Sequence, residues 1–170
     1  MYNLETLKSE VSAGKEFKYI LFWGGIYSQW YPSPFTIDGI EYPTAEHFMM
    51  AKKAELFQDT ESLEKIMKTS DPAEAKAIGR KVVGYNDYNW NKIREDVVIQ
   101  GNKEKFLQNP ELRKQLFDSG EDILVEASPY DKIWGIGLSE DDHRASDPLN
   151  WRGLNLLGFC IMHVRGMLRG

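Results

Sequence analysis

Two segments far apart in this chain carry most of the side chains that could do chemistry: EYPTAEHFMMAKKA over residues 41–54 and LVEASPYDKIWGIGL over residues 124–138. Each places carboxylates, an aromatic ring and turn-forming residues within a short stretch. Segments that only form hydrophobic core rarely contain so many polar side chains. Carboxylates beside large rings could bind a flat base or a sugar and assist cleavage of the bond between them.

The first segment contains a helix start. Thr44 is a good N-cap, which places Glu46 and His47 in the first helical turn. Glu46 and Lys53 then share a helical face, and the helix dipole favours an ionised Glu46. A reaction through an oxocarbenium ion needs such a carboxylate, and Lys53 could meet a phosphate. The alternative is a solvated Glu–Lys face, and His47 is expected to be a structural hydrogen-bonding residue.

The second segment is a strand-like run followed by a loop bounded by Pro129 and two glycines. This loop delivers Glu126, Asp131 and Trp134 together. Trp134 is next to Gly135 and could stack on a base, as aromatic side chains do with splayed nucleobases. The alternative is that Trp134 belongs to the core and Asp131 caps a turn.

Several other side chains are weaker candidates. Ser28 and Trp30 lie in an aromatic loop, FWGGIYSQWYPSPF, which is typical of a ligand wall. Arg80 and Arg94 could each pair with a phosphate or act as plain salt-bridge donors. Asn155 stands where the last expected helix begins and could be its N-cap.

Caps and apolar periodicity predict a mainly α fold with a few short β-strands. The expected helices cover residues 3–12, 44–57, 62–68, 72–81, 88–107, 110–119 and 155–168. The longest is expected to start at an Asp87 cap, to turn Trp90 inward and to be interrupted at Gly101–Asn102. Residues 19–23 are predicted to be a buried strand, residues 29–39 a loop or hairpin, and LVEAS another strand.

Composition limits the function classes. A length of 170 residues, 42% hydrophobic and 28% charged, is expected to form a single domain, residues 1–170. The net charge of −5 disfavours broad nucleic-acid binding but allows a local site for one phosphorylated nucleotide. No apolar run approaches the roughly 20 residues that span a bilayer, and no secretory signal is expected. The lone Cys160 is expected in the core and fits the cytoplasm. We expect no metal, because zinc-ligand spacing is absent, and no cofactor.

Further motifs occur in a characteristic order. FW…YSQW…PF…DG precedes PTAEHFMMAKKA, and DP.EAK.IGR, NW…R and GN..KF.QNP.L lead to LVEASPYDKIWGIGL and W.G.NLLG. This order, over about residues 22–165, resembles the YbiA-like NADAR family, whose name refers to NAD and ADP-ribose. Residues 1–16 lie outside the resemblance.

The resemblance implies a compact, mainly helical domain with N-glycosidase activity. Some members resemble enzymes that cleave early riboflavin-pathway intermediates, and others resemble hydrolases that remove ADP-ribose from guanine bases of nucleic acid. By motif position, the family's functional residues correspond to Glu46, Lys53, Asp131, Trp134 and Asn155. Ile136 stands where some members carry an acidic residue, which leaves the substrate open.

The hypothesis from the sequence is therefore an ADP-ribosyl glycohydrolase acting on guanine in DNA or RNA, with a nucleotide substrate and no membrane partner. Glu46 and Asp131 are the predicted catalytic residues. The predicted substrate-binding residues are Trp134, Lys53, Ser28, Trp30, Trp90, Arg80, Arg94, Glu126, Gly135 and Asn155. The alternatives are an N-glycosidase of riboflavin intermediates, a non-catalytic module that binds NAD or ADP-ribose, and a structural helical domain.

Overall fold

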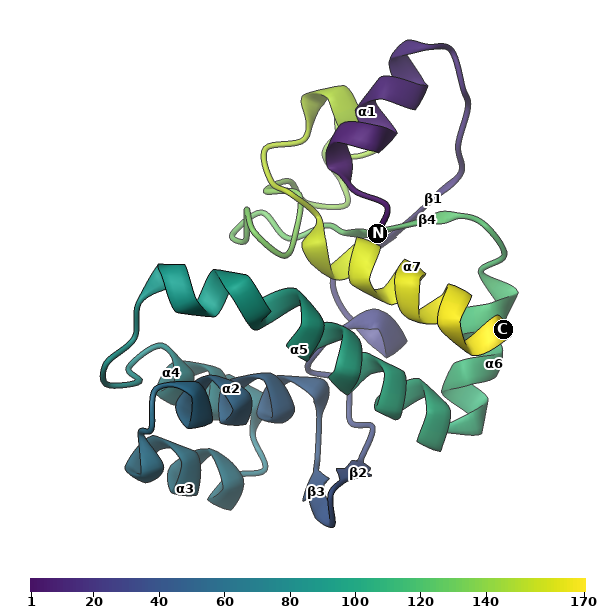
Figure 1. The fold of residues 1–170 in the computed structure, drawn as a ribbon. Helices are drawn as coiled ribbons and strands as arrows, with labels where there is room; N and C mark the ends of the chain where they lie inside the picture. The colour runs from purple at the N-terminus through teal and green to yellow at the C-terminus, as the bar shows by residue number, and fades with distance from the viewer. The chain divides into compact units, whose positions relative to one another are not determined.

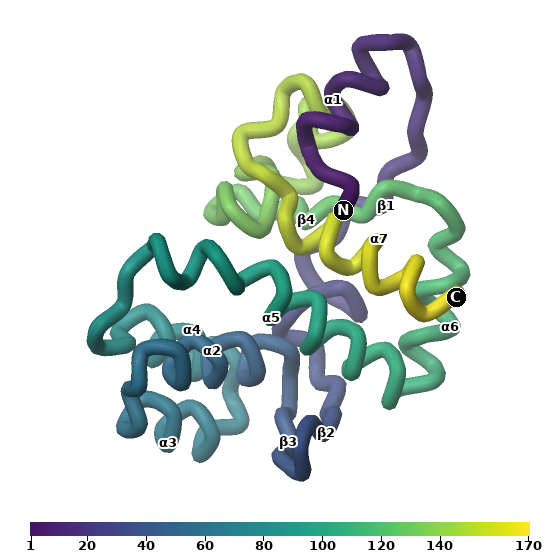
Figure 2. Tube along the Cα trace, in the orientation of Figure 1, coloured from purple at the N-terminus to yellow at the C-terminus, as the bar shows by residue number.

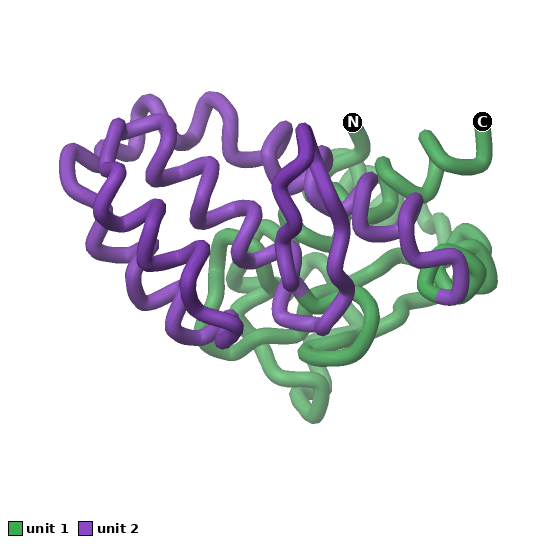
Figure 3. Tube along the Cα trace, turned by 90° about the horizontal axis from the view of Figure 1, so that it is seen from below, with its two compact units in different colours: residues 1–28, 112–170 green, residues 29–111 purple.

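The predicted helical character is confirmed. The computed structural model describes residues 1–170 and contains seven α-helices and four short β-strands (Figure 1). The chain divides into two compact units (Figure 3). Unit 1 comprises residues 1–28 and 112–170, and unit 2 comprises residues 29–111.

Unit 2 is built around one central helix. Its elements are β2 (Phe35–Ile37), β3 (Ile40–Tyr42), α2 (Ala45–Leu56), α3 (Thr60–Lys68), α4 (Pro72–Gly79) and α5 (Asp87–Gln108). Helix α2 packs against α3, α4 and α5, and every residue from 44 to 51 is buried. The first two turns of α2 therefore lack the solvated face of an ordinary surface helix. The predicted hairpin is confirmed: β2 and β3 pair antiparallel around the left-handed turn residues Asp38 and Gly39.

Two glycines allow α2 to approach its neighbours closely. A Cβ atom at Gly79 on α4 would lie 2.0 Å from Met50 Sδ, and one at Gly101 on α5 would lie 2.7 Å from Phe48 Cδ1. Gly101 therefore serves helix packing, and α5 continues through it without a break. The predicted interruption at Gly101–Asn102 is wrong, because the Phe48 ring packs in the space that a side chain at Gly101 would need.

The caps of unit 2 agree with the sequence except at α5. Thr44 and Asp71 cap α2 and α4 as predicted. Helix α5 is capped by Asn86, which accepts a hydrogen bond from the Asn89 N–H at 2.9 Å, and not by Asp87. Both residue types cap well, but the Asp87 carboxylate is occupied by the Tyr85 hydroxyl, which donates to it at 2.7 Å.

Unit 1 joins the two ends of the chain. Its elements are α1 (Leu4–Ser12), β1 (Tyr19–Phe22), the 3₁₀ turns Gly25–Tyr27 and Pro148–Asn150, most of α6 (Pro110–Asp118), β4 (Ile123–Glu126) and α7 (Leu156–Arg169). Strands β1 and β4 pair in parallel from Tyr19↔Ile123 to Phe22↔Glu126, and α7 packs on β4 (Figure 2). The core of unit 1 lies among β4, α1, α7 and the loop after β4.

The strand predicted over residues 19–23 is shorter and less buried than expected. Strand β1 ends at Phe22, which is its only fully buried residue. Trp23 is 58% exposed. The ladder ends there because β4, the only partner of β1, ends at Glu126. The prediction of a buried Trp23 is therefore wrong.

Other expectations from composition concern Cys160 and membranes. Cys160 is buried in α7, which confirms its predicted place in the core. None of the helices combines the length and apolar character that crossing a bilayer requires. No group of three or more His, Cys, Asp or Glu side chains is arranged to hold a metal ion.

Lys105 on α5 has no exposed surface. Its Nζ lies 5.9 Å from the centre of the Tyr31 ring and 5.2 Å from that of the Phe106 ring. Burial lowers the pKa of Lys105 from 10.5 to about 7. The unfolded chain therefore binds a proton at this side chain over a pH range in which the folded chain does not.

We expect Lys105→Met to change how the free energy of unfolding depends on pH. As the pH falls from about 10 to 7, the wild type loses stability because a proton binds Lys105 in the unfolded state only. The Met variant lacks this loss. The difference in the free energy of unfolding, variant minus wild type, should grow by about 3 kcal/mol from about pH 9.5 to pH 7. Urea unfolding across that range measures it, with Lys103→Met on the same helix as the control. A difference that does not change with pH would contradict the expectation.

Candidate active site

The first turn of α2 positions Glu46. The Thr44 hydroxyl caps the helix by accepting a hydrogen bond from the His47 N–H at 3.3 Å. The N–H of Glu46 donates to the Gln29 carbonyl at 3.0 Å, so the backbone is also held from outside the helix. The Glu46 side chain is only 4% exposed. Burying a carboxylate is costly, so the alternative of a solvated Glu–Lys face is excluded for Glu46.

Lys53 lies on the same face of α2, two turns after Glu46. Its side chain is half-buried, and its Nζ lies 4.2 Å from the centre of the Tyr85 ring and 5.8 Å from that of the Trp90 ring. Aromatic faces attract a cation within about 6 Å. The two rings therefore favour this position of the ammonium group.

The charges around Lys53 come from several elements. Burial lowers the pKa of Lys53, the carboxylates of Glu46 and Asp87 act in the opposite direction, and the Arg80 guanidinium reinforces the lowering. Two carboxylates and a guanidinium thus lie within electrostatic range of Lys53. We call Glu46, Lys53, Arg80, Tyr85 and Trp90 the α2 cluster. It contains four of the predicted site residues.

Tyr85 is the member of the α2 cluster that the sequence analysis missed. Burial and the hydrogen bond to Asp87 raise the pKa of its hydroxyl, and the charge of Arg94 lowers it. Arg94 on α5 therefore lies near the cluster as well. The signal in the sequence was the run YNDYNW, in which aromatic and polar residues alternate at the start of α5.

His47 and Trp30 have other surroundings in unit 2. His47 is fully buried, with Nδ1 2.8 Å from the Thr44 hydroxyl and Nε2 donating to the Thr69 carbonyl at 3.0 Å. Burial lowers its pKa, and its predicted structural role is confirmed. Trp30 is exposed beside α4, where the Lys76 Nζ lies 5.9 Å from its ring centre.

The loop after β4 carries the candidates of unit 1. Asp131 Oδ1 accepts hydrogen bonds from the N–H groups of Ile133 and Trp134, both at 2.8 Å. The Ser128 hydroxyl oxygen accepts from the N–H groups of Tyr130 and Asp131 at 3.3 and 3.2 Å. The alternative that Asp131 caps a turn is therefore confirmed. Both bonds use Oδ1, which leaves Oδ2 for other partners.

Gly135 and Asn155 hold this loop against β4. A Cβ atom at Gly135 would lie 2.8 Å from the Glu126 carbonyl oxygen, so no larger residue fits. The fully buried Asn155 accepts from the Glu126 N–H and donates to the Leu124 carbonyl, both at 2.9 Å. Asn155 is the N-cap residue of α7, as the sequence allowed, but its side chain makes no capping hydrogen bond. Its left-handed backbone turns the amide toward β4 instead.

The remaining unit 1 candidates are half-buried. Ser28 follows the first 3₁₀ turn, and its N–H donates to the Gly25 carbonyl at 3.0 Å. Trp134 is half-buried, unlike the core residue Trp151, and Glu126 ends β4. Ile136, the position that varies in the resembled family, lies in the core. An acidic residue at this position would need different surroundings.

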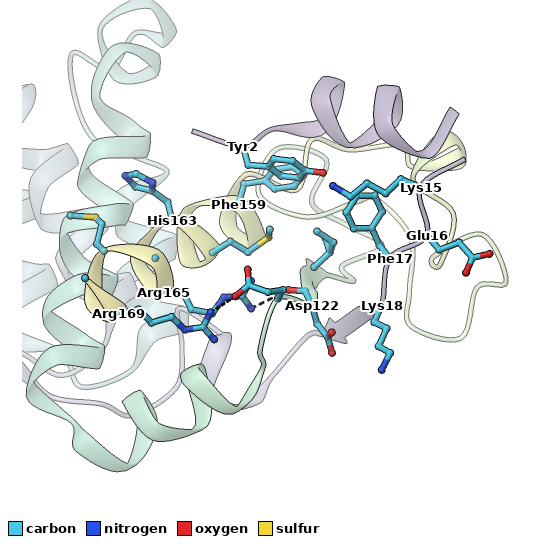
Figure 4. Close-up of a pocket in the computed structure, with 16 residues that line it drawn as sticks. Tyr2, Lys15, Glu16, Phe17, Lys18, Asp122, Phe159, His163, Arg165 and Arg169 are labelled. Carbon is cyan, nitrogen blue, oxygen red and sulfur yellow. Dashed lines mark hydrogen bonds and ion pairs between the residues drawn. The ribbon is translucent and has the colours of Figure 1, made fainter. Parts of the chain in front are cut away.

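A cavity of about 1120 Å³ lies elsewhere in unit 1 (Figure 4). The rings of Tyr2, Phe17 and Phe159 line it, together with polar side chains of α7 and of the N-terminal segment. None of the residues predicted for catalysis or substrate binding lines it. The cavity is therefore separate from the candidate site.

Comparisons with known proteins agree with the fold and narrow the chemistry. A family model described as "NADAR domain" matches residues 21–169, which include parts of both units. The chain is similar to N-glycosidase R617 of Acanthamoeba polyphaga mimivirus, with 42% identity over 161 residues that cover 87% of this chain and 95% of that protein.

Two further relatives extend the comparison. Riboflavin biosynthesis protein VVA0006 of Vibrio vulnificus is 34% identical over 85% of this chain, which spans 36% of that longer protein. The NMR structure of the E. coli protein YbiA has a TM-score of 0.74 and 29% identity, covering 91% of this chain and 87% of that chain. The helical architecture is thus shared with a solved structure.

Proposed function

The chain belongs to the NADAR domain family and, like the N-glycosidases to which it is similar, is a hydrolase of N-glycosyl bonds; on this premise we propose that it removes ADP-ribose from guanine bases of nucleic acid. The substrate would combine a base, a ribose and a diphosphate. Each of these groups needs a different kind of side chain, and unit 2 offers all three kinds.

The observation that carries this proposal is the α2 cluster. It combines the nearly buried carboxylate of Glu46 with the ammonium of Lys53 and the guanidinium of Arg80. The rings of Tyr85 and Trp90 flank the ammonium. A carboxylate suits a ribose carbon that becomes cationic, cations suit a diphosphate, and rings suit flat or sugar surfaces.

The proposed reaction is hydrolysis at C1 of the ribose. The bond between C1 and the guanine nitrogen breaks, its electron pair stays on the nitrogen, and an oxocarbenium-like ribose forms. Glu46 stabilises this cation and takes a proton from the attacking water. Water oxygen bonds to C1, the departing nitrogen receives a proton, and the products are free ADP-ribose and unmodified guanine.

The loop after β4 has an assisting role in the proposal. Asp131 uses Oδ1 for its turn, so Oδ2 would contact the ribose hydroxyls or pass a proton to the departing base. Trp134, half-buried on the same loop, would stack on the base or the ribose. Glu126 and Asn155 would support this loop through the bonds that join it to β4.

One alternative substrate class has its own support. The similarity to riboflavin biosynthesis protein VVA0006 favours cleavage of the base–ribose bond in an early riboflavin-pathway intermediate. Such a substrate carries one phosphorylated ribose and no nucleic-acid strand. The same α2 cluster would serve it, because the bond that breaks is also N-glycosidic.

Release of free ADP-ribose from a single-stranded oligonucleotide with one ADP-ribosylated guanine tests the proposal. A duplex of the same sequence is the matched substrate, because a base inside a duplex must first be flipped out. We expect release from the single strand. Turnover of riboflavin-pathway nucleotides without release from the oligonucleotide would favour the alternative. Binding of ADP-ribose without turnover of either substrate would show a non-catalytic module.

A further inference from the structure

The parallel pair β1–β4 brings two chain segments out of unit 1 side by side. Phe22 and Glu126 are the last paired residues of the two strands. The N–H of Ala127 still donates to the Phe22 carbonyl at 2.7 Å, just beyond the paired strands. Because the carboxyl ends of parallel strands meet at one edge, Trp23 and the loop after β4 leave the sheet together, as ligand-binding loops of α/β sheets do.

Two large rings stand exposed at this edge. Trp23 is 58% exposed and Tyr130 is 85% exposed, and their ring centres lie 6.2 Å apart with an angle of 48° between the planes. Neither ring contributes much buried area to the fold. An exposed aromatic pair of this size is informative, because single scattered apolar residues are normal on a surface but adjoining large rings mark an interaction site.

The backbone beneath each ring is held by the fold. Tyr130 lies in the turn that Ser128 and Asp131 hold together, and its own N–H is one of the bonded groups. Trp23 directly follows the last residue of β1. Beside Trp23, Cβ atoms placed at Gly24 or Gly25 would meet nothing within 4 Å, so the space next to the ring is open. A backbone held in advance loses little conformational entropy on binding.

Two cations stand on the segment that follows β4. Lys132 and Arg152 are both exposed, and their stems converge at Gly137: a Cβ atom placed there would lie 3.1 Å from Lys132 Cγ and 3.1 Å from Arg152 Cβ. Exposed rings with neighbouring cations are how proteins hold single-stranded nucleic acid, with the bases on the rings and the phosphates on the cations. Carboxylates stand on the same segment, Asp131 among them, so the two cations form a local site and not a basic face.

We propose that Trp23 and Tyr130 form a stacking platform for an unmodified base of a single-stranded nucleic acid, with Lys132 and Arg152 on the adjoining phosphates. This inference rests on the proposed function, in which the substrate is a nucleic acid. It names the substrate as a strand and not as a free nucleotide. Its binding contacts lie in unit 1 and concern a base on which no chemistry occurs.

Binding of an unmodified, fluorescently labelled single-stranded oligonucleotide tests the platform without any turnover. We expect Trp23→Ala and Tyr130→Ala each to raise the Kd about ten-fold, since stacking on one ring is worth roughly that factor or more. Trp23→Phe and Tyr130→Phe keep a ring and should stay near the wild-type Kd. Lys132→Gln with Arg152→Gln should flatten the dependence of log Kd on log salt. Circular dichroism confirms that each variant is folded.

A second arm separates the platform from the proposed function. On an ADP-ribosylated oligonucleotide the two Ala variants should lose about ten-fold in kcat/KM relative to their kcat/KM on an ADP-ribosylated guanosine. Absence of turnover with a preserved Ala effect on binding would reject the proposed function and keep the platform. Equal Kd values in the wild type and the Ala variants, or weaker ADP-ribose binding without weaker strand binding, would overturn the platform.

Discussion

Glu46→Gln is expected to lower kcat for ADP-ribose release by about 10²–10⁴-fold, the usual effect of removing an essential acid–base group. Glutamine has the shape of glutamate but carries no negative charge and takes no proton from water. Glu46 is nearly buried in the first turn of α2, so its charge is little screened by solvent. The lost charge would therefore be felt fully by an oxocarbenium-like transition state.

The loss of the Glu46 charge has a second consequence. That charge opposes the effect of burial, which lowers the pKa of Lys53. In Glu46→Gln the pKa of Lys53 should fall further, and the amine should lose its proton at lower pH. Any phosphate contact made by Lys53 would then weaken on the alkaline side. The residual activity of the variant should accordingly decline at a lower pH than that of the wild type.

Glu55→Gln is the matched control for this experiment. Glu55 lies on the same helix and is exposed, with an ion pair to Lys52 at 2.7 Å. Surface pairs of this kind contribute little to stability. Single-turnover rates of both variants measure the effect of each substitution. Thermal unfolding checks that both variants are folded. A folded Glu46→Gln protein with the full wild-type rate would remove Glu46 from the mechanism.

Asn155→Ala is expected to lower the free energy of unfolding by about 2–5 kcal/mol, because it leaves two buried backbone groups without partners. These are the Glu126 N–H and the Leu124 carbonyl, each 2.9 Å from the amide of Asn155. Alanine is also strained at the left-handed backbone of this position, where φ is 54°. Chemical unfolding measures the loss, with Asn150→Ala at an exposed position as the control.

Asn155→Gly separates the two causes. It loses the same two hydrogen bonds but relieves the backbone strain, so it should be more stable than Asn155→Ala by about 1 kcal/mol. The family resemblance predicts a substrate contact for Asn155, whereas the structure shows the side chain positioning β4 and the loop. A stable Asn155→Ala protein whose only defect is a raised KM would favour the substrate contact.

Much of the fold could be predicted from local sequence. Thr44 and Asp71 cap the helices that they were expected to cap, and the turn at Asp38 and Gly39 forms the expected hairpin. These features depend on hydrogen bonds and backbone preferences within a few residues. The same holds for the position of Glu46 in a first turn and for the Asp131 turn, since both are set by neighbours in the chain.

Other features depended on tertiary contacts. Lys53 lies near the rings of Tyr85, which precedes α5, and Trp90, which lies in the first turn of α5. Lys105 is buried, and the Tyr31 ring near it comes from a distant segment of the chain. Asn155 follows the α7 cap pattern in sequence, yet its amide bonds to β4, about thirty residues earlier. Trp23 continues an apolar run but is exposed, because its strand has one partner and that partner ends.

The physical reason is the same in each case. A cap or a turn is satisfied by groups close in the chain, so residue types and spacing determine it. The burial of a charge, the partner of an amide and the exposure of a ring depend on which distant segments pack together. For this protein the sequence alone determined the helices and the positions of the candidate chemical groups along them, whereas packing decided which of those groups contact one another.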